Sequence, residues 1–427
     1  MPGAAAPSAS SPALVVAVNR AAAHAWPGGS PEGPHRIFYV LQGLARGVGL
    51  TASGLAPTEE SLSASTPPAL LRVLPGPPPP PPASLLTSIH PPAYLAALAA
   101  IRTHTKVADE DDEVEFTYAG PGTAAAAVQA VGAVVAVVDA VCGWDEGACG
   151  GRVGGVAMRP AGLALVRPPG HHAGPGGPDL RASAVGLGTP PGRAPSGFCM
   201  LSNVALAAAH ARSAWGLARP LIIDLDVHVG DGTQAALRGR WARGDALVID
   251  LHEAGVWPFD TGAADDMGPP EGPSIINVPL PPGSGDAAAR EAFARVIAPA
   301  AAGFKPSIVF VSLGLDAHAA DPLGRLGWCS ATYGFLLAAI AGLAAEHAGG
   351  RLVVALEGGY SEGGLVRGTA ATVRALVQRQ GVAGRGRTVA DEGADEGGTD
   401  VDEEAERATD GAVVATLDEV CERHGLM

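Results

Sequence analysis

The sequence of 427 residues is short of aromatic residues and of cysteines, and each shortage limits what the protein can be. Aromatic residues are 4% of the chain and hydrophobic residues 47%, so Ala, Val and Leu must build the core. The five cysteines are an odd set without a Cys-x-x-Cys pair, which disfavours a disulfide framework and a thiolate zinc site. We expect ordinary buried thiols in a reducing compartment.

Positive charge is also scarce, because 28 Lys and Arg residues face 43 Asp and Glu residues, for a formal net charge of −15. This balance argues against direct nucleic-acid binding, which needs clustered basic residues. We count no apolar run of the roughly 18 to 20 residues that a membrane span needs. The N-terminus does not resemble a secretion signal, so the expected location is the cytoplasm, the nucleus, or a plastid or mitochondrion.

Short runs rich in Val, Ile and Leu predict buried strands. These runs are Ala13–Val18, Leu163–Val166, Leu221–Leu225, Ala246–Leu251, Ser274–Leu280, Ile308–Leu313 and Leu352–Leu356. Ala-rich stretches with helical spacing lie between many of them, namely Thr123–Val141, Asn203–Ala214, Asp286–Ala302, Ala331–Ala348 and Gly364–Gln378. The alternation predicts an α/β fold in which helices cover both faces of a mainly parallel sheet, with three αβα layers.

Three segments interrupt this alternation and are predicted to be flexible insertions. They are the polyproline stretch Pro77–Pro82, the Gly/Pro-rich loop Gly174–Pro195 and the acidic segment after Asp391. We therefore expect one domain over residues 13–380, followed by a disordered acidic tail over residues 381–427.

Polar residues that follow the predicted strands form a coherent set, because ligands bind beyond the carboxyl ends of parallel strands. His171 and His172 follow one strand, although adjacent histidines alone more often mark a surface turn. Asp224, Asp226 and His228 follow another and point to one side by strand alternation. Burying such a cluster is costly unless a cation compensates it.

A third carboxylate and a tyrosine complete the set. Asp316 follows the strand at Ile308, and two carboxylates with one imidazole have the ligand count of a catalytic zinc site. In Leu356-Glu357-Gly358-Gly359-Tyr360, the glycines permit a sharp turn that presents the phenol to a cleft. A tyrosine there is most often a packing residue, but beside a metal its hydroxyl could donate to an oxyanion.

These motifs resemble, in order and over about His24 to about Val377, those of the histone deacetylase family, which includes acetylpolyamine amidohydrolases. Ser30–Arg36, Gly197–Cys199 with Asn203, and Asp321–Gly324 also agree with the family. The resemblance implies the arginase/deacetylase fold and a hydrolase that removes acetate from N-ε-acetyl-lysine in histones or other proteins. It further implies one zinc ion per chain and a structural monovalent cation, K⁺, beneath it.

The resemblance also assigns roles to single residues. Asp226, His228 and Asp316 match the zinc ligands, and Tyr360 matches the oxyanion donor. His172 matches the general base and His171 the second proton-transfer group, oriented by Asp231 and Asp224, respectively.

Other residues match the substrate tunnel and the product exit. Phe198 and Trp257 match its aromatic walls, with Leu323 on a third side and Gly170 and Gly358 also expected to contact the substrate. Arg36 matches an arginine near the acetate exit. Core packing for Trp257 and a surface salt bridge for Arg36 are the alternatives.

Three departures from the family pattern leave the substrate open. Val229 stands where a His or an aromatic is common, Asp250 where a Ser or Thr is common, and the loop Trp257–Gly262 differs from the usual one. An acetylpolyamine or other small acetylated amine is the alternative substrate, and a non-catalytic acetyl-lysine-binding scaffold is a second alternative. A dinuclear ureohydrolase is disfavoured because too few further ligands are present.

Overall fold

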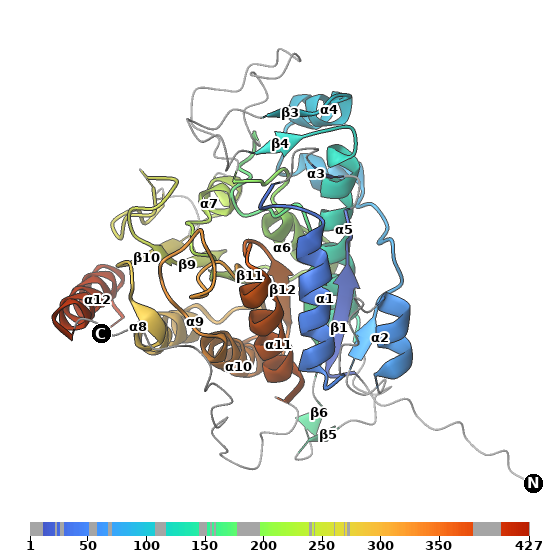
Figure 1. The fold of residues 1–427 in the computed structure, drawn as a ribbon. Coiled ribbons are helices and arrows are strands. Elements are labelled where there is room, and N and C mark those ends of the chain that lie inside the picture. Colours follow the sequence, from blue (N-terminus) through green and yellow to red (C-terminus); the bar gives the residue numbers. More distant parts are fainter. Residues whose placement is uncertain are drawn as a thin grey trace, which may run out of the picture.

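The central sheet contains all seven predicted strands and one further short strand, and its pairings are all parallel. Its strand order is β10-β9-β8-β11-β12-β7-β1-β2 (Figure 1). The strands are β1 (Leu14–Val18), β2 (Leu71–Val73), β7 (Ala161–Leu165), β8 (Pro220–Asp224), β9 (Leu247–Glu253), β10 (Ser274–Leu280), β11 (Ile308–Leu313) and β12 (Leu352–Leu356). The expected α/β class is confirmed, and all carboxyl ends lie along one edge of the sheet.

The computed structural model describes residues 12–21, 24–25, 30–50, 58–66, 71–106, 117–144, 152–153, 156–157, 159–176, 197–238, 241–242, 244–259, 261–268, 270, 274–378 and 403–426. Two small antiparallel pairs lie outside the main sheet. They are β3 (Thr105–Lys106) with β4 (Tyr118–Ala119) and β5 (Arg152–Val153) with β6 (Val156–Ala157).

Helices cover both faces of the sheet, as predicted, because successive residues of each strand point to opposite faces. Leu221 and Ile223 of β8 join one apolar core, whereas Ile222 joins the other. The first face is covered by α1 (His35–Gly47), α2 (Glu59–Ser65), α8 (Gly285–Ala292), the π-helical turn η2 (Phe293–Ile297), α9 (Ala298–Phe304), α10 (Ser330–His347) and α11 (Glu362–Gln378). The second is covered by α3 (Ala83–Thr87), α4 (Pro92–Ala100), α5 (Thr123–Cys142), α6 (Asn203–Trp215) and α7 (Asp231–Leu237).

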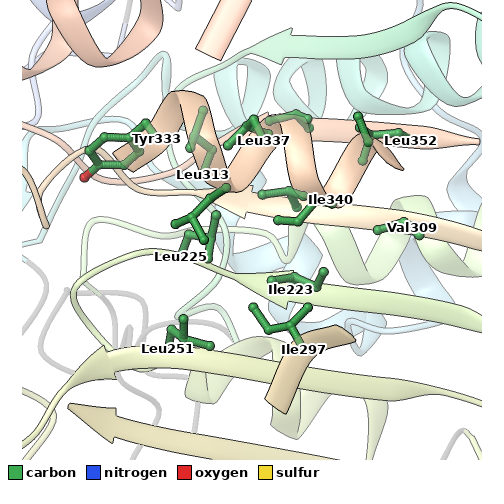
Figure 2. Packing of buried hydrophobic residues seen from close by; sticks show 14 of the residues in the cluster. Ile223, Leu225, Leu251, Ile297, Val309, Leu313, Tyr333, Leu337, Ile340 and Leu352 are labelled. Carbon is green, nitrogen blue, oxygen red and sulfur yellow. The ribbon is translucent and has the colours of Figure 1, made fainter. Parts of the chain in front are cut away.

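The first core joins helix α10 to the middle of the sheet. Figure 2 shows Leu337 and Ile340 of α10 lying over strand side chains such as Leu313 and Ile223. All four side chains are at most 1% exposed. This packing holds β8 and β11 against a rigid support just before their carboxyl ends.

Helix α5 corrects our expectation about membrane-length segments. By length and composition its 20 residues could cross a membrane, with a mean hydropathy of 2.1 in its most apolar window. Within the protein, however, 61% of that window is buried, and α5 packs against β1, β7 and α6. The apolar composition is thus what a helix between a sheet and a second helix requires.

The polyproline stretch is not a free insertion. Pro78 and Pro81 are buried, and the carbonyl of Pro79 lies so close to Gly132 of α5 that a side chain there would collide with it. The prediction of flexibility was wrong here because a rigid proline run can pack against a helix as well as span a gap. The Gly/Pro-rich loop lies outside the described residues from residue 177 to residue 196.

The predicted disordered tail is wrong for its last part, which forms helix α12 (Glu403–His424). Val413, Leu417, Val420 and Cys421 repeat at helical spacing, are at most 5% exposed, and belong to the first core. This face packs against β10, η2 and α8 (Figure 1). The prediction was wrong because it relied on acidic composition, whereas the apolar residues of this segment are few but have the regular spacing of an amphipathic helix. Residues 379–402 lie outside the described part of the chain.

Replacing a buried residue of α12 should therefore destabilise the whole domain. We expect Leu417→Ala, at a side chain 1% exposed, to lower the free energy of unfolding by roughly 2 to 4 kcal/mol. Val414→Ala on the same helix, at a side chain 52% exposed, should change it by less than about 1 kcal/mol. Denaturant unfolding of both variants measures this, and equal effects would contradict the docking of α12.

Candidate active site

The predicted motifs meet at the carboxyl edge of four adjacent strands. β8, β11, β12 and β7 are neighbours in the sheet although they are far apart in the chain. Asp226 and His228 follow β8, Asp316 follows β11, Glu357 follows β12, and the two histidines follow β7. Parallel strands thus deliver every polar motif to one place.

Asp226, His228 and Asp316 form the candidate metal site. One ligand atom of each lies within 4.8 Å of the other two. Nδ1 of His228 is 3.1 Å from Oδ1 of Asp226 and 3.5 Å from Oδ2 of Asp316. Both carboxylates are 0% exposed, and Oδ2 of Asp316 has no hydrogen-bond donor among the described residues. The donor set and this unsatisfied oxygen fit a bound zinc ion.

Glycines make room for these carboxylates. A side chain at Gly358 would begin 2.0 Å from Oδ2 of Asp316 and 2.5 Å from Oδ2 of Asp226. The backbone N–H of Gly358 also donates to Oδ2 of Asp226 over 2.8 Å. A side chain at Gly314 would begin 2.3 Å from the same oxygen. These glycines are required by close approach of the backbone to the ligands.

The electrostatics of this trio also favour a cation. Burial raises the pKa of Asp316 to about 6, and the neighbouring Asp226 adds to the rise. Burial opposes ionisation of Asp226 as well, but His171 and His228 lower its pKa well below the usual value. Burial would lower the pKa of His228, yet Asp226 and Asp316 raise it to about 10. Positive charge is therefore stabilised where the three side chains converge.

The two predicted histidines lie side by side, and each is held by the predicted carboxylate. Nδ1 of His171 is 3.2 Å from Oδ2 of Asp224, and Nδ1 of His172 is 2.9 Å from Oδ1 of Asp231. The ring centroids are 4.0 Å apart. Each ring is thus oriented through Nδ1, which leaves Nε2 for chemistry.

The two rings differ in protonation. Burial opposes the charged form of His171, but Asp226 and Asp224 outweigh it and raise its pKa well above the usual value. Burial lowers the pKa of His172 far below the usual value, and positive charge on His171 and His228 lowers it further. The surroundings therefore favour the protonated form of His171 and the neutral form of His172, which can accept a proton.

Glu357 was not predicted to have a role. Its Oε2 accepts hydrogen bonds from the backbone N–H groups of Gly170, at 2.6 Å, and His171, at 3.2 Å. Burial raises its pKa to about 7. Its place in the sequence, a carboxylate directly after a buried strand, was the signal that could have identified it. It holds the turn that carries the histidines.

The predicted tunnel walls lie beside the histidines and the tyrosine. The rings of Phe198 and Tyr360 have centroids 5.5 Å apart, and Trp257 meets His172 edge-on at 4.7 Å. Trp257 is half-buried, so it is not part of the apolar core, and its role as a tunnel wall stays a prediction. Half-buried Leu323 precedes Gly324, whose backbone abuts the carbonyl of Asp316.

Tyr360 is held from two sides. Its backbone N–H donates to Oδ2 of Asp321 over 2.6 Å, and the guanidinium of Arg36 lies 4.9 Å from its ring centroid. Burial raises the pKa of its phenol well above the usual value, and the charges of Asp316 and Asp226 contribute to the rise. The phenol therefore stays protonated and can act as a hydrogen-bond donor.

Arg36 is fully buried, which rules out the surface salt bridge considered above. It donates to the carbonyls of Glu357 and Gly359, immediately before Tyr360. Its other partner, Glu32, also binds Arg167 through two charged hydrogen bonds of 2.7 Å. Burial alone would raise the pKa of Glu32, but Arg167 and His24 lower it to about 2. Glu32 thus links both turns of the site.

Two of the residues that depart from the family pattern, Val229 and Asp250, are buried, and Asp250 contacts several protein groups. Asp250 accepts hydrogen bonds from the backbone N–H of Gly230 and the amide of Gln234, and it contacts Nδ1 of His252 at 2.8 Å. It is the register partner of Asp224 across β8 and β9. A K⁺ ion beneath the metal site stays a prediction.

The model of the family described as "Histone deacetylase domain" matches residues 30–376. "Histone deacetylase 10, chloroplastic" of Oryza sativa subsp. japonica is 44% identical over 227 residues, which are 53% of this chain and 46% of that protein. "Histone deacetylase-like amidohydrolase" of Pseudomonas aeruginosa is 36% identical over 244 residues, covering 57% of this chain and 56% of that one.

A solved structure, the crystal structure of the HDA15 HD domain, matches with a TM-score of 0.68 and 26% identity. It covers 97% of this chain and 95% of that chain. The chain spans about half the length of the curated relatives named above.

Removing the charge of Glu32 should destabilise the fold and impair the site. Glu32→Gln leaves Arg167 buried without a full counter-charge, so we expect a loss of roughly 3 kcal/mol in the free energy of unfolding. Asp245→Asn is the control, because Asp245 is 43% exposed and pairs with Arg212 only at 3.6 Å. That change should cost less than about 1 kcal/mol. Similar midpoints for both variants in denaturant unfolding would argue against a supporting role of Glu32.

Proposed function

This chain belongs to the histone deacetylase family, whose model matches most of it, and we propose that it hydrolyses the acetamide of N-ε-acetyl-lysine in proteins, releasing acetate. The observation that carries the proposal is the convergence of two carboxylates and an imidazole beside two oriented histidines and a half-buried tyrosine. Each group has a separate task in the hydrolysis of an amide.

Zinc is the metal that the donor set of Asp226, His228 and Asp316 fits. When bound there, it would polarise the amide carbonyl and acidify a water molecule. The three side chains provide two negative charges and one neutral nitrogen and leave coordination positions for other ligands. One such ion per chain is sufficient for the reaction.

The histidines and the tyrosine then handle protons and developing charge. His172, held by Asp231, accepts the proton of the attacking water through its free Nε2. His171, which carries a proton, supports proton transfer to the departing lysine amine. The phenol of Tyr360 donates a hydrogen bond to the carbonyl oxygen as that atom becomes negative.

The rim and the floor suit the remaining parts of the substrate. Phe198 and Trp257 would flank the aliphatic stem of the lysine and exclude water from it. Beneath Tyr360, the guanidinium of Arg36 provides the positive charge that an acetate product requires. The rice relative carries "chloroplastic" in its name, so we propose a plastid as the compartment to test first.

Loss of either the base or a ligand should abolish deacetylation, by different routes. We expect His172→Ala to lower kcat on an acetyl-lysine peptide by at least about 100-fold while zinc stays bound. Asp316→Ala should lose both zinc and activity. Metal analysis with single-turnover assays separates the two, and His210→Ala is the control, because His210 of α6 pairs with Asp139 of α5 and with none of the site residues. Near-normal turnover in either variant would refute the mechanism.

A side-by-side assay decides the substrate. Zinc-loaded protein is given acetylated histone peptide, acetylated tubulin peptide and acetylpolyamine at matched concentrations. We expect a higher kcat/KM for the peptides. A preference for the polyamine would instead assign small acetylated amines, and binding of all three without turnover would assign the scaffold function.

A further inference from the structure

A second group of buried ligand atoms lies next to the candidate zinc site. It consists of the imidazole of His171, the thiol of Cys199 and the carboxylate of Glu357, and one ligand atom of each lies within 4.8 Å of the other two. The three residues are at most 3% exposed. They come from the ends of β7 and β12 and from the segment before α6, so no local motif connects them. We call this group the thiol site.

The carboxylate of the thiol site has an unpartnered oxygen, and the other two members place a thiol and an imidazole beside it. Oε1 of Glu357 is buried and accepts no hydrogen bond from the described residues, whereas Oε2 holds two N–H groups. Sγ of Cys199 accepts a hydrogen bond from the N–H of His172 over 3.4 Å and donates one to the carbonyl of Gly197 over 3.3 Å, and metal binding would replace the second. His171 is fixed through Nδ1, and its Nε2 faces the metal trio, 3.6 Å from Oδ2 of Asp226.

An unpartnered buried acceptor is costly unless a ligand satisfies it. Sulfur, nitrogen and oxygen donors together are the ligand types that zinc takes in proteins. A thiolate also selects against Mg²⁺ and Ca²⁺, which prefer oxygen ligands. Deprotonated Cys199 and Glu357 would balance the two positive charges of the ion, so its burial would leave no net charge. Water or a substrate oxygen could take a fourth position.

We propose that the thiol site binds a second zinc ion and that this ion inhibits the enzyme. The inhibition rests on the proposed function, because the ion would hold the imidazole of His171 and so prevent this ring from transferring a proton. Binding displaces the protons of the thiol and of any protonated partner to bulk water, as is general for thiolate sites. The site thereby makes deacetylation sensitive to free zinc beyond one equivalent.

Cobalt is the probe, because Co²⁺ replaces zinc and absorbs in the near ultraviolet when a thiolate binds it. Metal-stripped full-length protein is titrated with Co²⁺ under reducing conditions. We expect two ions per chain, the thiolate band to grow only with the second equivalent, and activity to rise to one equivalent and then fall. Cys199→Ser should bind one ion, show no thiolate band and lose the fall in activity.

Cys142→Ser is the matched control, since Cys142 is a half-buried free thiol at the end of α5, and both ions should remain. If Cys199→Ser does not fold, Glu357→Gln serves, and it should weaken the second ion at least tenfold while the first is unchanged. A single ion per wild-type chain, a thiolate band that persists in Cys199→Ser, or unaltered second-ion binding in Glu357→Gln would overturn the proposal. If the protein with one equivalent of Co²⁺ hydrolyses none of the acetylated amines, the proposed function is refuted. The absorption titration would still test the thiol site in that case.

Discussion

Buried negative charge at the carboxyl edge of the sheet is the constraint on which the rest of this structure depends. Asp224, Asp226 and Asp316 are at most 1% exposed and lie within one site, where burial alone disfavours their ionised forms. Such a cluster persists only if positive charge and donors surround it. The histidines and the backbone N–H of Gly358 are compensating groups, and the arrangement of the carboxylates fits a metal ion as a further one.

A second buried charge network, around Glu32, connects the site to the N-terminal part of the chain. Glu32 binds Arg167 and lies near Arg36, and the two arginines hold backbone carbonyls on opposite sides of the site. Arg167 precedes the turn with the histidines, and Arg36 supports the turn with Tyr360. The proposed general base and the proposed oxyanion donor are therefore linked through one carboxylate.

The loop that carries Trp257 forms the rim of the site, and this loop departs from the family pattern. Asp250 and His252 connect the floor to the loop that carries Trp257, because Nε2 of His252 lies 3.0 Å from the carbonyl of Gly262. Val229 packs between them, and a side chain at Gly262 would begin 3.0 Å from it. A change beneath the metal site can thus shift the aromatic wall above it. We propose that this loop decides substrate preference, whereas the strands position the candidate metal ligands.

The sequence by itself determined the strands, the order of the motifs and the identity of the first metal trio. Short apolar runs report burial directly, and parallel strands bring their carboxyl ends together without further information. It did not determine the docking of α12, because the few apolar residues of this acidic segment become buried only when the helix packs against β10. It also gave no sign of the thiol site, because His171, Cys199 and Glu357 are far apart in the chain. Only tertiary structure decided their proximity, since distances between side chains depend on how strands are ordered in the sheet.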